Sequence, residues 1–409
     1  MFDILFKKSI FVLFLHSVRV VSFFIFYKLI LYAFGSDFSS SYAIIDSWVL
    51  IITSLVSFGF NETVLRLFKD FNSDLKLFLI QYIKIFLPIF FITIPLVLLF
   101  STKQGLDFYY FIPIFVLINI FTIVINGIIR TFNYVVYANL FENLFPLFLL
   151  ILTVLIVLFD YSNINVFHSW IFSKLFVLFL AFLFLLFFVS MKNISLSSSI
   201  TIKSLLIIAL PILIANFSIV ALNEIPVIFL GINSNSVDIL SFKIGFKIAS
   251  LMWLIQFSFY NIIAPTIPKI FAEKKYKELS EIVIKQTKNS FFLNFIYFFF
   301  LVFFGDYILH FISPDITLDF MTMFVLSITY LMNSLFGPIG LLFQITKYEK
   351  NYMFLMMFLF ILLIIIGYPI SKNFGSLGMS FLIFFLFLLR NIYARYFFIK
   401  VFGRKLSLV

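Results

Sequence analysis

The chain has 409 residues, of which 63% are hydrophobic and 11% are charged, and its mean hydropathy is +1.17. Soluble domains are roughly half apolar, so this composition excludes a water-soluble catalytic domain and is typical of a multi-span membrane protein. The net charge of +11 comes from cations that flank apolar stretches, where they serve topology and anionic headgroups, so we expect no nucleic-acid partner.

About twelve apolar stretches of roughly 20 residues follow one another, which is the length a helix needs to cross a bilayer core of about 30 Å. We therefore expect an all-α polytopic membrane protein with about 12 transmembrane helices. The predicted spans are residues 10–34, 43–60, 78–100, 109–129, 139–159, 167–190, 204–230, 239–263, 291–312, 318–343, 353–370 and 377–399.

Lys and Arg fall almost wholly into every second gap between the spans. With the N-terminus in the cytoplasm, 20 of the 29 cations lie on the inward side when Arg395, at the inner end of the last span, is included. Only Lys103 and Lys372 lie outside, and the other seven lie within spans. Cytoplasmic loops carry the excess of Lys and Arg, so we expect both termini in the cytoplasm. The localisation that we predict is the bacterial cytoplasmic membrane.

The spans divide evenly near residue 200. We expect an N-terminal six-helix lobe, residues 1–200, and a C-terminal six-helix lobe, residues 201–409. An even number of spans inserts both lobes the same way up, and a substrate would then be expected between them. In the second lobe, Lys and Glu surround apolar positions in residues 270–288, which predicts an amphipathic helix on the cytoplasmic surface.

Cations inside spans cost at least about 2.5 to 3.5 kcal/mol each, so they normally face a partner or a hydrated cavity. In the first span, His16 and Arg19 share a helix face, and in the eighth, Lys243 and Lys247 are four residues apart on one stripe. These stripes predict a cationic cavity for an anion such as a diphosphate. The alternatives are a structural ion pair for Arg19 and headgroup contact for the two lysines.

The seventh span contains Pro211, Asn216, Asn223, Glu224 and Pro226. The two asparagines, seven residues apart, share a face, and the prolines free backbone groups and permit bending. We interpret this span as a bending gate or a cation-binding site. Glu224 is either a counter-ion to a lysine or a site for H⁺ or Na⁺ coupling.

Two further arginines, Arg66 and Arg130, lie at cytoplasmic ends of spans. They either contact lipid headgroups or capture an anionic substrate headgroup at the inner mouth of the bundle.

The absence of Cys excludes disulfides and thiolate chemistry, and three widely separated His residues make a metal site improbable. There is no P-loop, hydrolase elbow, zinc-binding helix or pair of carboxylates in a catalytic arrangement. We therefore expect a transporter and not an enzyme, with no catalytic residues, no metal and no resident cofactor. Coupling to H⁺, Na⁺ or the membrane potential is the expected energy source.

Several short segments, in this order and spacing, resemble O-antigen flippases of the Wzx type, within the multidrug/oligosaccharidyl-lipid/polysaccharide (MOP) superfamily. The segments are Ser57-Phe58-Gly59-Phe60 through Arg66, Leu210-Pro211-Ile212-Leu213, Leu230-Gly231, Phe246-Lys247-Ile248-Ala249-Ser250, Ile263-Ala264-Pro265, Leu335-Phe336-Gly337-Pro338-Ile339-Gly340, Thr346-Lys347-Tyr348-Glu349-Lys350 and Asn373-Phe374-Gly375-Ser376-Leu377-Gly378.

The resemblance implies two six-helix lobes that export an undecaprenyl-diphosphate-linked oligosaccharide, an O-antigen or capsule-type repeat unit, by alternating access. The expected partners are this glycan, membrane lipids and other polysaccharide assembly proteins. The alternatives are a lipid II or teichoic-type flippase and a multidrug exporter of the same superfamily. A membrane polysaccharide polymerase is the enzyme alternative, but it should have a large outward loop, and the outward loops here are short.

Overall fold

The computed structural model is helical throughout the residues that it describes, with no strand among them. The structure describes residues 2–61, 63–64, 75–103, 108–132, 134–159, 162–188, 202–263, 267–345, 348–403 and 407–408. The helices separate into two compact units, Phe14–Glu224 and Ile225–Val409, the second of which includes Met1–Leu13. The predicted lobe boundary near residue 200 falls in a segment outside the described residues and stays a prediction.

The unit Phe14–Glu224 is held together by packed helices and a cluster of aromatic rings. Helices α4, α5 and α6 contact one another. The Phe167 ring of α6 lies within 5.7 Å, between ring centroids, of Phe38 in α1 and within 5.1 Å of Phe111, while Phe115 stacks on Trp170 at 3.9 Å. The elements of this unit are α1 (Phe2–Val56, from Phe14 on), α3 (Leu75–Lys103), the 3-10 turn η1 (Tyr109–Phe111), α4 (Ile112–Thr131), α5 (Val135–Leu158), α6 (Ile164–Phe188) and α7 (Ile202–Asn233, as far as Glu224).

The unit Ile225–Val409 is built around α12, which contacts α8, α9, α11 and α14. Its small hydroxyl residues Thr322, Ser327 and Ser334 are buried, which lets neighbouring helices approach closely. The elements that follow α7 are α8 (Ser236–Ala249), α9 (Leu251–Ile263), α10 (Ile267–Ala272), α11 (Tyr276–Ile312), α12 (Phe320–Phe336), α13 (Ile339–Ile345) and α14 (Glu349–Phe402).

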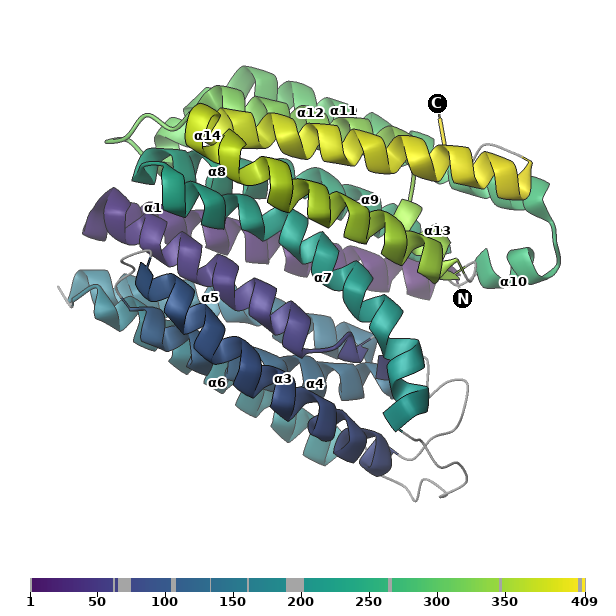
Figure 1. Ribbon diagram of the computed structural model, residues 1–409, viewed down its shortest axis with the longest axis horizontal. Helices are drawn as coiled ribbons and strands as arrows, with labels where there is room; N and C mark the ends of the chain where they lie inside the picture. The colour runs from purple at the N-terminus through teal and green to yellow at the C-terminus, as the bar shows by residue number, and fades with distance from the viewer. Residues whose placement is uncertain are drawn as a thin grey trace. The chain divides into compact units, whose positions relative to one another are not determined.

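The two longest helices each reverse direction at a glycine (Figure 1). Gly35 in α1 has φ 78° and ψ −178°, and Gly375 in α14 has φ 54° and ψ −145°. This region of backbone conformation is essentially restricted to glycine, because a side chain would clash there. Each of these helices therefore consists of two arms, and each arm overlaps one predicted span.

The observed helices overlap the predicted spans along the chain. Among the described residues, seven helices are long and apolar enough to cross a membrane, including α1 from Ser17 and α14, and shorter apolar helices occur at Leu79–Pro95 and Phe320–Phe336. The eighth predicted span is broken at Ser250 into α8 and α9. The all-α, polytopic fold class is confirmed, whereas the number of spans and the side of the termini stay predictions.

The expected surface helix over residues 270–288 is wrong in its extent. Helix α10 ends at Ala272, and α11 begins at Tyr276 and runs without interruption to Ile312. Its first turns bury Leu279, Ser280 and Val283, so their apolar face packs on protein and continues into the span. The segment is helical from Tyr276 on, as predicted, and its place at the cytoplasmic membrane surface stays a prediction.

Carboxylates tie three helix starts together in this unit. Asp238 in α8 accepts hydrogen bonds from the backbone nitrogen and Oγ of Ser376, at 3.3 and 2.8 Å. Asp319 caps α12 by accepting from the backbone nitrogens of Met321 and Thr322, both at 3.0 Å. The Oγ1 atom of Thr322 lies 3.1 Å from Ser376 Oγ. The reversal of α14 at Gly375 is thus fixed to the ends of α8 and α12.

We predict that Gly375→Ala lowers the melting temperature in detergent more than Gly35→Ala does. Both variants place a side chain in a glycine-only conformation, at a cost of about 1 to 3 kcal/mol. An added Cβ at Gly375 would also lie 3.0 Å from both Asp238 carboxylate oxygens, whereas one at Gly35 meets nothing within 4 Å. Gly35→Ala is therefore the matched control for the backbone cost, and equal melting temperatures would contradict a role for the Asp238 contact.

Candidate functional site

The most unusual group in the unit Phe14–Glu224 is Lys174, a half-buried lysine inside α6. Its Nζ lies 4.0 Å from the centroid of the Phe145 ring and 5.6 Å from that of Trp170. Within the described part of the chain it makes no hydrogen bond and no ion pair. Aromatic faces attract a cation by about 0.5 to 2 kcal/mol, which holds the ammonium group without neutralising it.

Three charged side chains are near enough to act on Lys174 electrostatically, namely Arg19, Glu142 and Asp46. Arg19 is exposed, and it too makes no hydrogen bond or ion pair with the residues that the structure describes. Two cations from α1 and α6 therefore share one neighbourhood and repel each other. The sequence predicted Arg19 as a substrate contact but did not single out Lys174.

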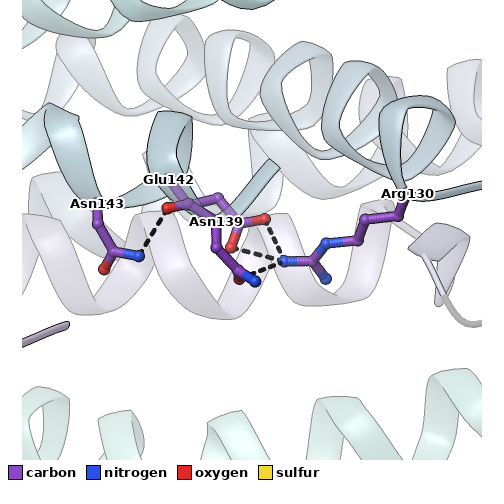
Figure 2. Close-up of polar contacts among 4 residues, drawn as sticks. All are labelled: Arg130, Asn139, Glu142 and Asn143. Carbon is purple, nitrogen blue, oxygen red and sulfur yellow. Dashed lines mark hydrogen bonds and ion pairs between the residues drawn. The ribbon is translucent and has the colours of Figure 1, made fainter. Parts of the chain in front are cut away.

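Arg130, another predicted substrate contact, is paired in this structure (Figure 2). Its Nη2 lies 2.8 Å from both carboxylate oxygens of Glu142 and donates to Asn139 Oδ1 at 3.3 Å. Asn143 Nδ2 donates to the backbone oxygen of Asn139 at 2.7 Å, one turn away on α5. The charge of Arg130 is therefore balanced within the unit, which leaves less of it for an anionic ligand.

Glu224 lies at the end of the same unit and is 5% exposed. Its Oε2 accepts a hydrogen bond from Ser47 Oγ at 2.8 Å. Tyr27 has both Asp46 and Glu224 as charged neighbours, and Asp46 also acts on Tyr42. Two acidic side chains thus share a buried, hydroxyl-rich region, an arrangement that can hold a proton or a small cation.

Several enclosed polar atoms of this unit have no hydrogen-bond partner among the residues that the structure describes. Such atoms are rare in proteins. They include Tyr27 Oη, Thr53 Oγ1, both amide atoms of Asn126, Asn143 Oδ1 and Ser173 Oγ.

The predicted lysines of the other unit differ in exposure. Lys243 is 1% exposed, so it is enclosed by protein and does not extend to lipid headgroups, while Lys247 is half-buried. Both engage in contacts with other groups. Of this pair, Lys247 has the accessible surface that a ligand requires.

Helix α7 continues through both Pro211 and Pro226 as one helix. Asn216 and Asn223 are half-buried and make no side-chain hydrogen bond within the described residues. The interpretation of this helix as a gate stays a prediction. Arg66 and the side chain of His16 lie outside the described residues.

No protein-family model matches the sequence, and no curated protein sequence matches it. Solved structures, in contrast, match this chain in fold. An inward-facing multidrug resistance MATE family transporter of the MOP superfamily aligns with a TM-score of 0.71 and 14% identity, covering 97% of this chain and 99% of that one. The outward-facing conformation of such a transporter aligns with a TM-score of 0.71 and 14% identity, covering 97% of this chain and 94% of that one. A MATE structure in the straight conformation aligns with a TM-score of 0.66 and 12% identity, covering 97% of this chain and 96% of that one.

The chain has the fold of a MATE-family transporter. The MATE fold agrees with the predicted MOP-like architecture and with a multi-pass membrane protein. Within this fold, the residues that sequence reasoning missed are Lys174, Asp46 and Glu142. A lysine in the middle of an apolar span was the available signal for Lys174, but the aromatic rings that hold it come from two helices and could not be assigned from spacing.

We predict that breaking the Arg130–Glu142 pair on one side destabilises the protein by about 1 to 3 kcal/mol, because the remaining charge is left in a partly buried site. Glu142→Gln and Arg130→Gln should each lower the melting temperature, and the double variant should be less destabilised than the sum of the two. The exposed pair Lys275–Glu273, with an N···O distance of 2.7 Å, is the control. Lys275→Gln should change stability little. Additive effects at Arg130 and Glu142 would contradict the pairing.

Proposed function

We propose that this protein is a flippase that moves an undecaprenyl-diphosphate-linked oligosaccharide, of the O-antigen or capsule repeat-unit type, from the cytoplasmic to the periplasmic leaflet. The observation that carries the proposal is the shared neighbourhood of Lys174 and Arg19, two cations without a carboxylate in contact. The MATE fold supports transport by alternating access, because its members are seen in inward- and outward-facing conformations.

A diphosphate matches these cations in charge and in chemistry. Two like charges at a low-dielectric site repel each other more strongly than in water, and an anion placed between them relieves that repulsion. A guanidinium binds phosphate oxygens through two parallel hydrogen bonds, while an ammonium acts as a point charge. Arg19 would therefore orient the diphosphate, and Lys174 would add to its electrostatic attraction. No covalent bond changes during the transfer.

The energy source that we propose is an ion gradient or the membrane potential. Moving charge across the membrane is worth about 2.3 kcal/mol per elementary charge per 100 mV, so the export of two negative charges from a negative cytoplasm gains about 4.6 kcal/mol. Glu224, with Asp46 and the hydroxyl groups around them, offers a place for a co-transported proton or Na⁺. In the counter-ion alternative, Glu224 balances a lysine and takes no part in coupling.

Multidrug export is the second candidate, because the structures with this fold include multidrug resistance transporters. The buried Glu224 favours it, since an acidic group can attract a cationic drug. Lys174 and Arg19, which contact no carboxylate within the described residues, oppose it, since they repel such a drug. A lipid II or teichoic-type flippase would use the same diphosphate chemistry and differ only in its cargo.

We predict that Arg19→Gln combined with Lys174→Gln abolishes flipping of an undecaprenyl-diphosphate-linked oligosaccharide in reconstituted vesicles. The measurement is the fraction of the labelled glycan that becomes accessible to an added glycosidase. Lys350→Gln, an exposed lysine at the start of α14, is the control and should flip normally. A parallel assay with Lys243→Ala and Lys247→Ala tests the predicted contribution of α8. Full flipping by the first double variant, or export of a cationic dye by the wild type but not of the glycan, would reject the proposal.

We predict that Glu224→Gln removes the dependence of transport on an imposed pH or Na⁺ gradient, because the amide cannot bind either ion as a carboxylate does. Ser47→Ala, which removes only the hydroxyl that donates to Glu224, should weaken the dependence without abolishing it. The initial rate of flipping is measured with and without each gradient. If Glu224→Gln responds to both gradients as the wild type does, Glu224 has a structural role only.

A further inference from the structure

A second embedded cation, Arg390, lies in the second arm of α14 and is held by neutral groups. It donates from Nη2 to Asn333 Oδ1 at 2.5 Å, and from Nη2 and Nε to Asn391 Oδ1, both at 3.4 Å. The guanidinium carbon is 4.4 Å from the centroid of the Phe387 ring. No carboxylate contacts it among the described residues. An arginine inside an apolar span thus keeps its full positive charge.

The amide groups around Arg390 form a chain across three helices, which fixes their orientation. Asn333 of α12 donates from Nδ2 to Gln256 Oε1 at 3.3 Å, and Gln256 of α9 donates to the backbone oxygen of Tyr330 at 3.5 Å. With Asn333 held in this way, its Oδ1 faces the guanidinium. Asn391 likewise presents Oδ1 to Arg390, so its Nδ2 is left as a donor.

Three donors at this place have no hydrogen-bond partner in the part of the chain that the structure describes. They are Arg390 Nη1, Asn391 Nδ2 and Tyr352 Oη, and none of them is among the fully enclosed polar atoms. Tyr352 belongs to the first arm of α14 and is close enough to act on Arg390 electrostatically. Arg390 and Asn391, joined by hydrogen bonds, thus offer two donors side by side, and Tyr352 is a third donor in their electrostatic neighbourhood.

The Tyr352 hydroxyl packs closely on a glycine. A Cβ at Gly340 in α13 would lie 3.1 Å from Tyr352 Oη, closer than ordinary van der Waals contact. Arg390 is half-buried on a helix face whose neighbours Phe387 and Ala394 are buried, so it points into its unit. Lys400 lies ten residues further along α14, about 15 Å along the helix axis, at the end predicted to be cytoplasmic.

We propose that Arg390, Asn391 and Tyr352 form a phosphate-binding site in the unit Ile225–Val409. The guanidinium supplies the charge and a planar pair of donors, and the amide and the phenol complete the set around the phosphate oxygens. The phosphate comes from the headgroup of an anionic lipid of the inner leaflet or from free phosphate in the cytoplasm. The site uses none of the residues assigned above to the cargo, so it stands whether or not the protein is a flippase.

The test uses the full-length protein in neutral detergent, with thermal unfolding as the readout. The probes are phosphatidic acid and diacylglycerol with the same short acyl chains, which differ only in the phosphate, and inorganic phosphate. Phosphatidic acid should raise the melting temperature of the wild type and diacylglycerol should not. Arg390→Gln should remove this rise, and Tyr352→Phe, which removes a single hydroxyl, should weaken the apparent affinity about tenfold. Lys350→Gln should respond as the wild type does.

The outcomes separate the two sources and the structural alternative. A rise with inorganic phosphate that Arg390→Gln abolishes supports the site with a soluble ligand, and a rise with phosphatidic acid alone supports it with a lipid ligand. A wild-type response in Arg390→Gln overturns the proposal, as does an equal response to diacylglycerol, since the guanidinium would then only tie helices together. If Arg390→Gln does not fold, Tyr352→Phe decides, and an unchanged affinity in that variant also overturns the proposal.

Discussion

Charged side chains inside apolar helices must be held by other parts of the protein, because the lipid core offers them no hydrogen bonds and insertion costs at least about 2.5 to 3.5 kcal/mol per charge. The protein meets this constraint in three ways. Arg130 is neutralised by Glu142, Lys174 lies against aromatic rings, and Arg390 is held by amide oxygens. Within the described residues, only Arg130 contacts a carboxylate, whereas neutral groups hold Lys174 and Arg390, and Glu142 and Asp46 act on Lys174 electrostatically without contacting it.

The fold places these groups through positions that have little freedom. Glycine-only conformations at Gly35 and Gly375 turn two long helices back on themselves, and Asp238 and Asp319 fix the second turn to neighbouring helix ends. In the unit Ile225–Val409 this brings Tyr352 and Arg390, from opposite arms of α14, into one electrostatic neighbourhood. A backbone constraint thus sets up a polar arrangement that neither arm could form alone.

Much of the fold could be predicted from the sequence, because the length and hydrophobicity of a span follow directly from the thickness of the bilayer. Breaks within a helical pattern are harder to predict than the spans themselves. The interruption at Ser250 and the continuity of α11 from Tyr276 depend on tertiary packing, which periodicity does not report. The reversals at Gly35 and Gly375 lie between predicted spans, and their position followed from the gaps in the hydrophobic pattern.

Side-chain partners were harder still to predict, because the sequence shows which polar residues are embedded but not which of them meet. Ser47 and Glu224 are 177 positions apart and share a hydrogen bond, and nothing in the local sequence of either indicates the other. Lys174 was visible as an embedded cation, yet its aromatic neighbours, Phe145 and Trp170, are residues of a type that fills the whole chain. The place of Arg130 at the end of a span suggests contact with lipid or substrate, and nothing in its local sequence identifies Glu142, on the next helix, as its partner.

The way in which each cation is held also bears on the choice between the two candidate cargoes. A carboxylate beside every embedded cation would leave the interior nearly neutral, and such an interior would exclude neither an anion nor a cationic drug. Rings and amides stabilise Lys174 and Arg390 without cancelling their charge, so an anion gains electrostatic energy at each place and a cation loses it. Glu224 accepts a hydrogen bond from Ser47, and Asp46 acts on Tyr27, Tyr42 and Lys174, so these acidic groups can bind a proton or a small cation and also balance part of the positive charge. An interior in which cations and acidic groups both occur fits the coupled movement of an anion and a small cation better than the export of a large cation.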